Sequence, residues 1–150
     1  MPPINLTDHG LAVLPQPDEA KLRELADTGV RTVVNLRNDG EDAQPMSVRD
    51  EGELCQKLGM DYVSLPVSMK TAGAALAGAF EKVLTAAREA GPVAVHCKLG
   101  QRAGAMVLIV LARHQRWDAE RALGEAERLG LDGVAGNPAL AGYVTSCLAE

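Results

Sequence analysis

Hydrophobic residues follow two alternating patterns along the chain, and each pattern predicts a different kind of element. Short runs rich in β-branched residues, such as the apolar centres of 30–37 (VRTVVNLR) and 93–96 (VAVH), predict buried strands. The segments between them have helical spacing or an alanine-rich composition, which predicts helices. In chain order we predict a helix over 17–29, a strand over 30–37, a helix over 46–58 and a strand over 60–66. A helix over 72–90 and a strand over 93–96 follow, then helices over about 102–115 and 117–129. The chain continues with a loop over 130–140 and a short final helix that contains Tyr143 and Leu148.

The alternation of strands and helices predicts the fold class. Strands separated by helices pair in parallel, so we expect an α/β three-layer sandwich with a mainly parallel central sheet flanked by helices. We expect residues 1–150 to form a single domain, because this length suits one hydrophobic core. In such sheets reactive groups lie beyond the carboxyl ends of the strands, and Cys97 directly follows the strand predicted over 93–96.

Composition and net charge argue against several classes of function. Hydrophobic residues make up 47% and charged residues 23% of the chain, which is typical of a globular protein. The net charge of −5 argues against a nucleic-acid-binding surface, which needs clustered lysine and arginine. No apolar run approaches the roughly 20 residues that a membrane span requires, so we expect no membrane partner. An odd number of widely spaced cysteines, together with a start that lacks an export signal, favours free thiols in a reducing cytoplasm.

Candidate chemistry is concentrated in the segment CKLGQRAG, which begins at Cys97. Backbone N–H groups of a loop that leads from a strand into a helix can converge on an anion, and Gly100 lets the loop curl. Arg102 supplies a planar fork of donors that suits a tetrahedral oxyanion, and Lys98 adds positive charge. The same field stabilises a thiolate, so the pattern predicts a cysteine nucleophile that acts on an anionic substrate.

Other titratable residues have simpler interpretations. Cys55 and Cys147 lie on predicted helices without a nearby glycine loop and are interpreted as buried core. Adjacent strand residues point to opposite faces, so His96 is interpreted as a supporting residue that hydrogen-bonds loop backbone, rather than as a base for Cys97. The acidic segment that contains Glu41, and Arg37 before it, is most simply a solvated loop, with a supporting role at the same sheet edge as the alternative. No metal ligand set or cofactor motif is found, so we expect neither.

The segment VHCKLGQRAG, with GVRTVVNLR, GMDYVSLPV and the helix before GPVAVHC, resembles the phosphatase-like domain of bacterial beta-lactamase-hydrolase-like proteins, which is related to cysteine-dependent tyrosine and dual-specificity phosphatases. The resemblance extends from about residue 11 to 130. It implies a protein-tyrosine-phosphatase-like fold with Cys97 as nucleophile and Arg102 as the oxyanion-binding arginine. The cradle it implies consists of the amides of Lys98, Leu99, Gly100, Gln101 and Arg102.

Three departures from the phosphatase pattern keep the reaction open. Only four residues (KLGQ) separate Cys97 from Arg102, where those phosphatases have five and rhodanese-type sulfurtransferases have four. Ala103 replaces the usual serine or threonine, and no carboxylate lies between Asp61 and Glu81, where the general acid of dual-specificity phosphatases is expected near Ser68. Without that acid, hydrolysis of alkyl phosphates falls by about 10²–10⁴-fold, and aryl phosphates suffer less.

Three hypotheses follow. The first is a phosphatase-like hydrolase that forms a phosphocysteine at Cys97 from an aryl phosphate or protein phosphotyrosine. The second is a rhodanese-like sulfurtransferase that carries a persulfide on Cys97. The four-residue gap between Cys97 and Arg102 favours this hypothesis. The third is a non-catalytic oxyanion-binding or redox-sensing module, for which a reactive thiol suffices.

Overall fold

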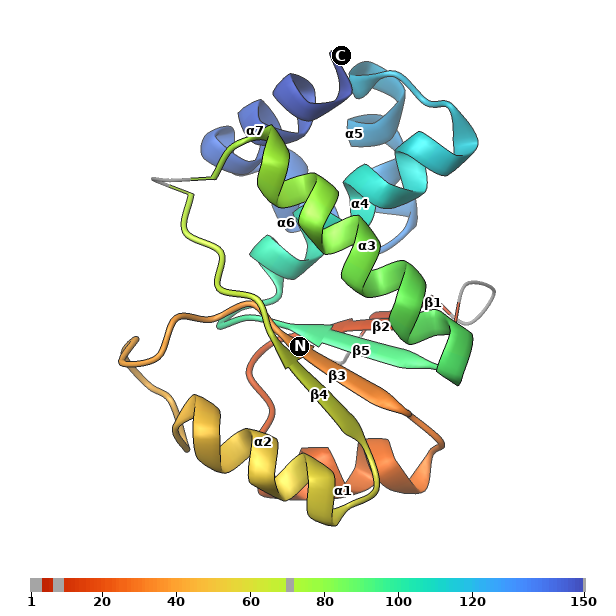
Figure 1. The fold of residues 1–150 in the computed structure, drawn as a ribbon. Coiled ribbons are helices and arrows are strands. Elements are labelled where there is room, and N and C mark those ends of the chain that lie inside the picture. The colour runs from red at the N-terminus through yellow and green to blue at the C-terminus, as the bar shows by residue number, and fades with distance from the viewer. Residues whose placement is uncertain (1–3, 7–9, 70–71, 150) are drawn as a thin grey trace.

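The computed structural model describes residues 4–6, 10–69 and 72–149, and it contains a five-stranded sheet between two layers of helices (Figure 1). The strand order is β1-β2-β5-β3-β4, and every neighbouring pair is parallel except β1 with β2. The predicted α/β three-layer sandwich with a mainly parallel sheet is therefore confirmed. The strands are β1 (Ile4–Leu6), β2 (Leu11–Leu14), β3 (Thr32–Asn35), β4 (Asp61–Ser64) and β5 (Val93–His96).

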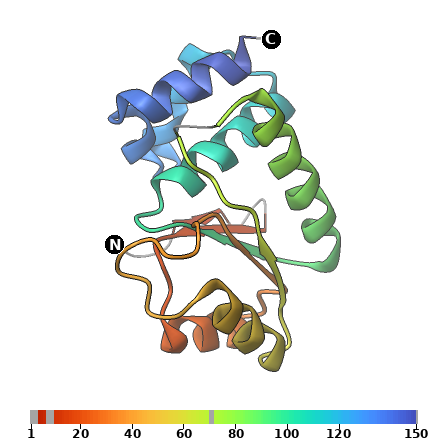
Figure 2. The same ribbon diagram turned by 60° about the vertical axis from the view of Figure 1, so that its left-hand side comes forward.

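The helices divide between the two faces of the sheet. Two helices, α1 (Glu19–Asp27) and α2 (Val48–Lys57), cover one face. The remaining helices lie on the other face, as Figures 1 and 2 both show. They are α3 (Ala74–Ala90), α4 (Gln101–Gln115), α5 (Ala119–Arg128), α6 (Asp132–Ala135) and α7 (Pro138–Leu148).

Each face of the sheet has its own hydrophobic core, because successive strand residues point to opposite sides. Val34 and Val95 belong to the core under α3, α4 and α7, which also contains Cys97. Val33 and Ala94 belong to the smaller core under α1 and α2. Helix α4 runs through the middle of the larger core, and all ten residues from 103 to 112 are buried.

Local signals explain where several helices begin. Asp18, Ser47 and Asp118 each accept a hydrogen bond from a backbone N–H of the first turn of α1, α2 and α5 respectively, which satisfies a donor that the helix itself cannot. Helix α4 has no such side-chain cap and begins instead at Gly100 in the left-handed conformation. Its first N–H groups therefore remain available to other acceptors.

The structure corrects the predicted elements in three places. Strands β1 (INL) and β2 (LAVL) were not predicted from the sequence, because each contains a single β-branched residue. Helix α6 lies within the predicted loop over 130–140. It was not predicted because a helix of four residues shows no apolar repeat.

Among the described residues no helix is both long enough and apolar enough to cross a membrane.

Candidate active site

Cys97 lies at the carboxyl end of β5, and the loop after it curls around its sulfur. The N–H of Gly100 donates to Cys97 Sγ at 3.2 Å, and the N–H of Ala103 donates to it at 3.5 Å. Gly100 has φ +89°, a conformation that favours glycine, and this turn aims its N–H back at the sulfur. Two backbone N–H donors thus converge on one sulfur.

The other amides of the loop remain free to bind an anion. The N–H groups of Lys98, Leu99, Gln101 and Arg102 have no hydrogen-bond acceptor among the residues that the structure describes. Those of Gln101 and Arg102 belong to the first turn of α4, where the helix dipole adds partial positive charge. The predicted amide cradle thus has unpaired donors on both sides of Gly100.

Arg102 is fixed beside the cradle by a carboxylate from a distant loop. Its Nη1 and Nη2 donate to the two carboxylate oxygens of Glu41 at 2.9 and 2.8 Å, and Nη1 also donates to the carbonyl oxygen of Val67 at 3.0 Å. Such a bidentate pair fixes the plane of the guanidinium. The hydrogen bond to Glu41 raises the pKa of Arg102, and the nearby Cys97 contributes in the same direction.

Glu41 corrects the interpretation of its segment as a solvated acidic loop. Its side chain is only 21% exposed, and it accepts hydrogen bonds from Arg102, Arg37 and the N–H of Asn38. Arg102 is the main cause that lowers the pKa of Glu41, so this carboxylate stays ionised at neutral pH. Sequence reasoning underestimated it because 61 residues separate it from Arg102.

A chain of buried polar side chains continues from Glu41 beneath the loop. Arg37 is fully buried, and its guanidinium donates to Glu41, to the carbonyl oxygen of Asp42, and to Gln16 Oε1 at 3.0 Å. Gln16 Nε2 in turn donates to Glu51 Oε1 at 2.9 Å. Gln16 and Glu51 were not predicted as site residues, because neither belongs to a motif and their contacts form only in the folded protein.

His96 ends this chain on the side of the sheet opposite to Cys97. Its Nε2 lies 2.6 Å from Glu51 Oε2, and both residues are almost fully buried. The prediction that His96 and Cys97 point to opposite faces is therefore confirmed. The expected hydrogen bond from His96 to loop backbone is not found, because its partner is a carboxylate of α2; its Nδ1 has no partner among the described residues.

Two further charged residues of the site, Lys98 and Asp42, contact each other. Lys98 directs its ammonium to Asp42, 2.8 Å away on the surface, and this contact lowers the pKa of Asp42. Glu41 and Asp42 are thus both ionised at neutral pH. Ser68 is half-buried in the segment where an acid was sought. The sequence has no carboxylate between Asp61 and Glu81, so the missing general acid stays a prediction.

The other two cysteines are buried, as predicted. Cys55 lies in the smaller core, where burial and the nearby Glu51 raise the pKa of its thiol to about 12. Cys147 lies in the larger core on α7. Among the described residues no group of three metal-ligating side chains is found.

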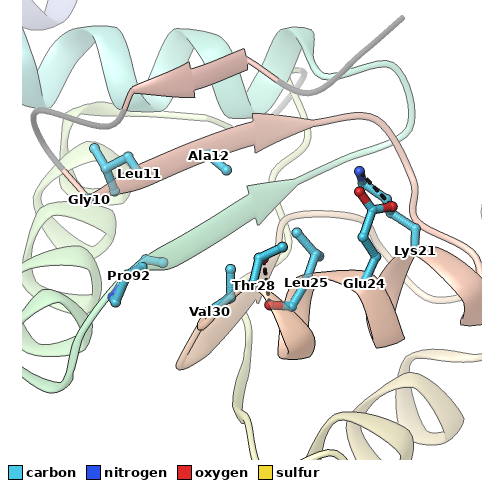
Figure 3. Close-up of a pocket in the computed structure, with 10 residues that line it drawn as sticks. Gly10, Leu11, Ala12, Lys21, Glu24, Leu25, Thr28, Val30 and Pro92 are labelled. Atoms are coloured by element: carbon cyan, nitrogen blue, oxygen red, sulfur yellow. Dashed lines mark hydrogen bonds and ion pairs between the residues drawn. The ribbon is translucent and has the colours of Figure 1, made fainter.

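A cavity of about 370 Å³ lies far from Cys97, at the amino ends of β2 and β5 (Figure 3). Gly10 and Pro92 mark this edge, and Lys21 and Glu24, the charged residues in its wall, form an ion pair with each other. Among the described residues that line it, the cavity therefore offers no unpaired charge, and it is separate from the cysteine site.

Comparisons with known proteins identify the family of the chain. Residues 4–113 match the family described as beta-lactamase hydrolase-like protein, phosphatase-like domain. The beta-lactamase hydrolase-like protein of Agrobacterium fabrum is 36% identical over 115 residues, which cover 73% of this chain and 26% of that protein. The one from Xylella fastidiosa is 32% identical over 120 residues, with coverages of 80% and 26%. The chain therefore spans about a quarter of the length of these relatives.

Solved structures of phosphatases share the fold. A DUF442 protein from Shewanella putrefaciens, described as a candidate phosphatase, has a TM-score of 0.75 at 26% identity, covering 93% of this chain and 87% of its own. P. aeruginosa TpbA has a TM-score of 0.72 at 25% identity, with coverages of 89% and 78%. Tk-PTP reaches a TM-score of 0.78 at 22% identity, with coverages of 97% and 93%. By sequence and by fold, the chain belongs to the phosphatase-like domain family of the beta-lactamase hydrolase-like proteins.

Proposed function

We propose that residues 1–150 form a single catalytic domain that hydrolyses phosphate monoesters through a thiolate at Cys97. The observation that carries the proposal is the convergence of the Gly100 and Ala103 N–H groups on Cys97 Sγ, with Arg102 fixed beside them. In this arrangement the free amides of the loop and Arg102 bind three phosphate oxygens, and Cys97 lies beneath the phosphorus. The chemistry requires a reduced thiol, in agreement with the expected cytoplasmic setting.

The reaction has two steps. Cys97 Sγ attacks phosphorus, an S–P bond forms, and the P–O bond to the organic group breaks, so that its electron pair leaves on the alkoxide or phenolate oxygen. Water then attacks the phosphocysteine, the S–P bond breaks with its electron pair returning to Cys97, and the proton from water passes to phosphate or solvent. Ala103 has no hydroxyl to stabilise the departing thiolate, so the two N–H donors on Sγ serve this purpose.

The substrate class follows from the missing acid. A phenolate leaves without protonation far more easily than an alkoxide, so a site without a carboxylic acid favours aryl phosphates and phosphotyrosine over alkyl phosphates. One solved structure of TpbA, which shares the fold, is a complex with pTyr. This relationship supports phosphotyrosine as the substrate type to test first.

One observation favours a second candidate, a sulfurtransferase. The four-residue gap between Cys97 and Arg102 has rhodanese length. In that reaction Cys97 takes the outer sulfur of thiosulfate, an S–S bond forms as sulfite leaves, and cyanide or a thiol then accepts the sulfur.

A paired assay distinguishes the candidates. Purified protein and its Cys97→Ser variant are given 4-nitrophenyl phosphate, and separately thiosulfate with cyanide. We expect phosphate release that depends on Cys97 and no thiocyanate. Thiocyanate without phosphate release would replace the phosphatase with the sulfurtransferase. If neither product forms while an alkylating reagent still labels Cys97 near neutral pH, both enzymatic proposals fail and the sensor hypothesis stands.

A further inference from the structure

Gln16 follows the carboxyl end of β2, and its backbone contacts the cysteine loop. Its N–H donates to the carbonyl oxygen of Lys98 at 3.1 Å. Because Pro15 and Pro17 have no N–H, Gln16 supplies the only backbone donor of the segment 15–17. The carbonyl group of the residue directly after Cys97 is therefore held by Gln16.

The bond to Lys98 also sets the direction of one amide of the loop. The carbonyl of Lys98 and the N–H of Leu99 belong to the same trans peptide plane, so these two groups point in opposite directions. Since the carbonyl points to the segment after β2, the N–H of Leu99 points away from it. This N–H has no acceptor in the described part of the chain, so its direction leaves it available to an anion.

The side chain of Gln16 is fixed at both ends of its amide. Oε1 accepts from Arg37 Nη1 at 3.0 Å, whereas Nε2 donates to Glu51 Oε1 and to the carbonyl oxygen of Pro17, each at 2.9 Å. One end therefore meets a donor and the other meets acceptors, a pattern that a glutamine satisfies and that a carboxylate or an apolar side chain does not. These contacts anchor the segment whose N–H holds Lys98.

Through Arg37 the same side chain reaches the arginine of the site. Arg37 is fully buried and donates to Glu41, whose carboxylate accepts from Arg102. Gln16 thus connects two groups that different elements supply to the oxyanion site, the amide of Leu99 and the guanidinium of Arg102.

We propose that Gln16 is a positioning residue of the oxyanion site, which aligns the N–H of Leu99 through its backbone and Arg102 through its side chain. The proposal rests on the proposed phosphatase function, since the anion is the phosphate of the substrate. Gln16 acts only through Lys98 and Arg37. Loss of its amide contacts should weaken phosphate binding about tenfold.

Binding of inorganic phosphate to Cys97→Ser tests this role without any chemistry. Gln16→Met, added to Cys97→Ser, keeps the length of the side chain and lacks both amide contacts, so calorimetry should show about tenfold weaker binding. Gln56→Met is the matched control, because Gln56 is exposed on α2, and it should leave the affinity unchanged. An unchanged affinity in the folded Gln16→Met protein overturns the proposal.

A nuclear magnetic resonance readout separates positioning from a general loss of stability. In Cys97→Ser the amide resonance of Leu99 should shift when inorganic phosphate saturates the site, and Gln16→Met should reduce this shift because the N–H no longer points at the anion. Leu84→Val, a truncation in the larger core, should lower the urea midpoint and leave the shift as it was. A Leu99 shift of equal size in Gln16→Met contradicts the proposal.

If Gln16→Met does not fold, Gln16→Glu takes its place. It keeps the acceptor for Arg37 and sets a second carboxyl group against Glu51, whose other oxygen contacts His96. Two such carboxyl groups share a proton at low pH and repel each other once both are ionised, so the loss of phosphate affinity should be larger at about pH 8 than at about pH 5. The same affinity as Cys97→Ser at both pH values overturns the proposal.

These measurements also separate the positioning role from the phosphatase function. Phosphate binding that depends on Gln16, in a protein that hydrolyses no ester, would keep the positioning role while the hydrolase fails. Hydrolysis that depends on Cys97, with a phosphate affinity indifferent to Gln16, would keep the hydrolase and overturn the positioning role. Absence of phosphate binding to Cys97→Ser would overturn the positioning role as well.

Discussion

Among single residues, Glu41 has the most direct influence on the geometry of the site. Its carboxylate accepts from both terminal nitrogens of Arg102 and from Arg37, so it fixes the guanidinium that we assign to the substrate phosphate. Because Arg102 holds its pKa far below the ordinary value of 4.5, Glu41 remains charged under acidic conditions. Its role is therefore to position Arg102, and it is unsuited to proton transfer.

Glu41→Gln should lower kcat/KM for an aryl phosphate by on the order of 10²-fold, since an Arg102 side chain displaced by an ångström loses its alignment with the phosphate. Asp42→Asn is the matched control, because Asp42 contacts Lys98 at the surface, and it should stay within a few-fold of the parent. Equal activities of the parent and the folded Glu41→Gln variant would remove Glu41 from this role.

The same carboxylate predicts how stability depends on pH. Below about pH 4.5 the unfolded chain protonates Glu41 while the folded protein does not, so this contribution to the free energy of unfolding declines as the pH falls. Urea midpoints measured at pH 6 and pH 3.5 should therefore differ more for the parent than for Glu41→Gln. Identical pH dependence in both proteins would show that the pair with Arg102 does not depress the pKa of Glu41.

At the scale of elements, the unit formed by β5, the loop and α4 creates the cradle. β5 brings Cys97 to the sheet edge, Gly100 turns the chain with a positive φ, and α4 starts without a side-chain cap. The unpaired donors of a helix start are thereby directed to an anion rather than to a capping residue.

Gly100→Ala should destabilise the protein by about 1–2 kcal/mol, because alanine is strained at φ +89°. It should also reduce phosphate release, since the Gly100 N–H would turn away from Cys97. Gly78→Ala, in the interior of α3 with open space around a Cβ, should instead stabilise by about 0.5–1 kcal/mol. Urea unfolding of both variants checks this prediction, and an unchanged midpoint for Gly100→Ala would contradict it.

Local signals made this unit predictable from the sequence. The strand 93–96, Cys97, Gly100 and Arg102 lie within ten residues, so motif and periodicity alone placed them correctly. Strand β2 was not predicted because its sequence, LAVL, has a single β-branched residue, and helix α6 was not predicted because four residues are too few for a helical apolar repeat. Strand β2 matters nevertheless, since the segment after it carries Gln16.

At the scale of the whole molecule, one polar network, largely shielded from solvent, connects the two layers of the sandwich at the sheet edge that carries Cys97. From His96 on β5 it passes through Glu51 on α2, Gln16 after β2 and Arg37 after β3 to Glu41 and Arg102. The sequence could not reveal it, because its contacting members are up to 61 residues apart and Gln16, Arg37 and Glu51 belong to no motif. In the sequence, Glu51 is one of several acidic residues of the predicted helix over 46–58.

Glu51→Ala should destabilise the protein by about 1–3 kcal/mol, since it leaves the buried ring of His96 without the carboxylate it contacts. Glu53→Ala is the matched control on the same helix, because Glu53 forms an exposed pair with Arg49 and should change stability by less than about 1 kcal/mol. Chemical denaturation followed by circular dichroism measures both. Similar losses for the two variants would mean that the contact of Glu51 with His96 does not tie the layers together.

The central claim is that Cys97 attacks phosphorus, and acid quenching of the enzyme during turnover of an aryl phosphate tests it most directly. We predict a phosphoryl adduct, detected by mass spectrometry of proteolytic peptides, on the peptide that contains Cys97. The adduct should be absent from Cys97→Ser. A Cys97 peptide that carries no phosphoryl group during active turnover, or that instead acquires an extra sulfur from thiosulfate, would contradict the account.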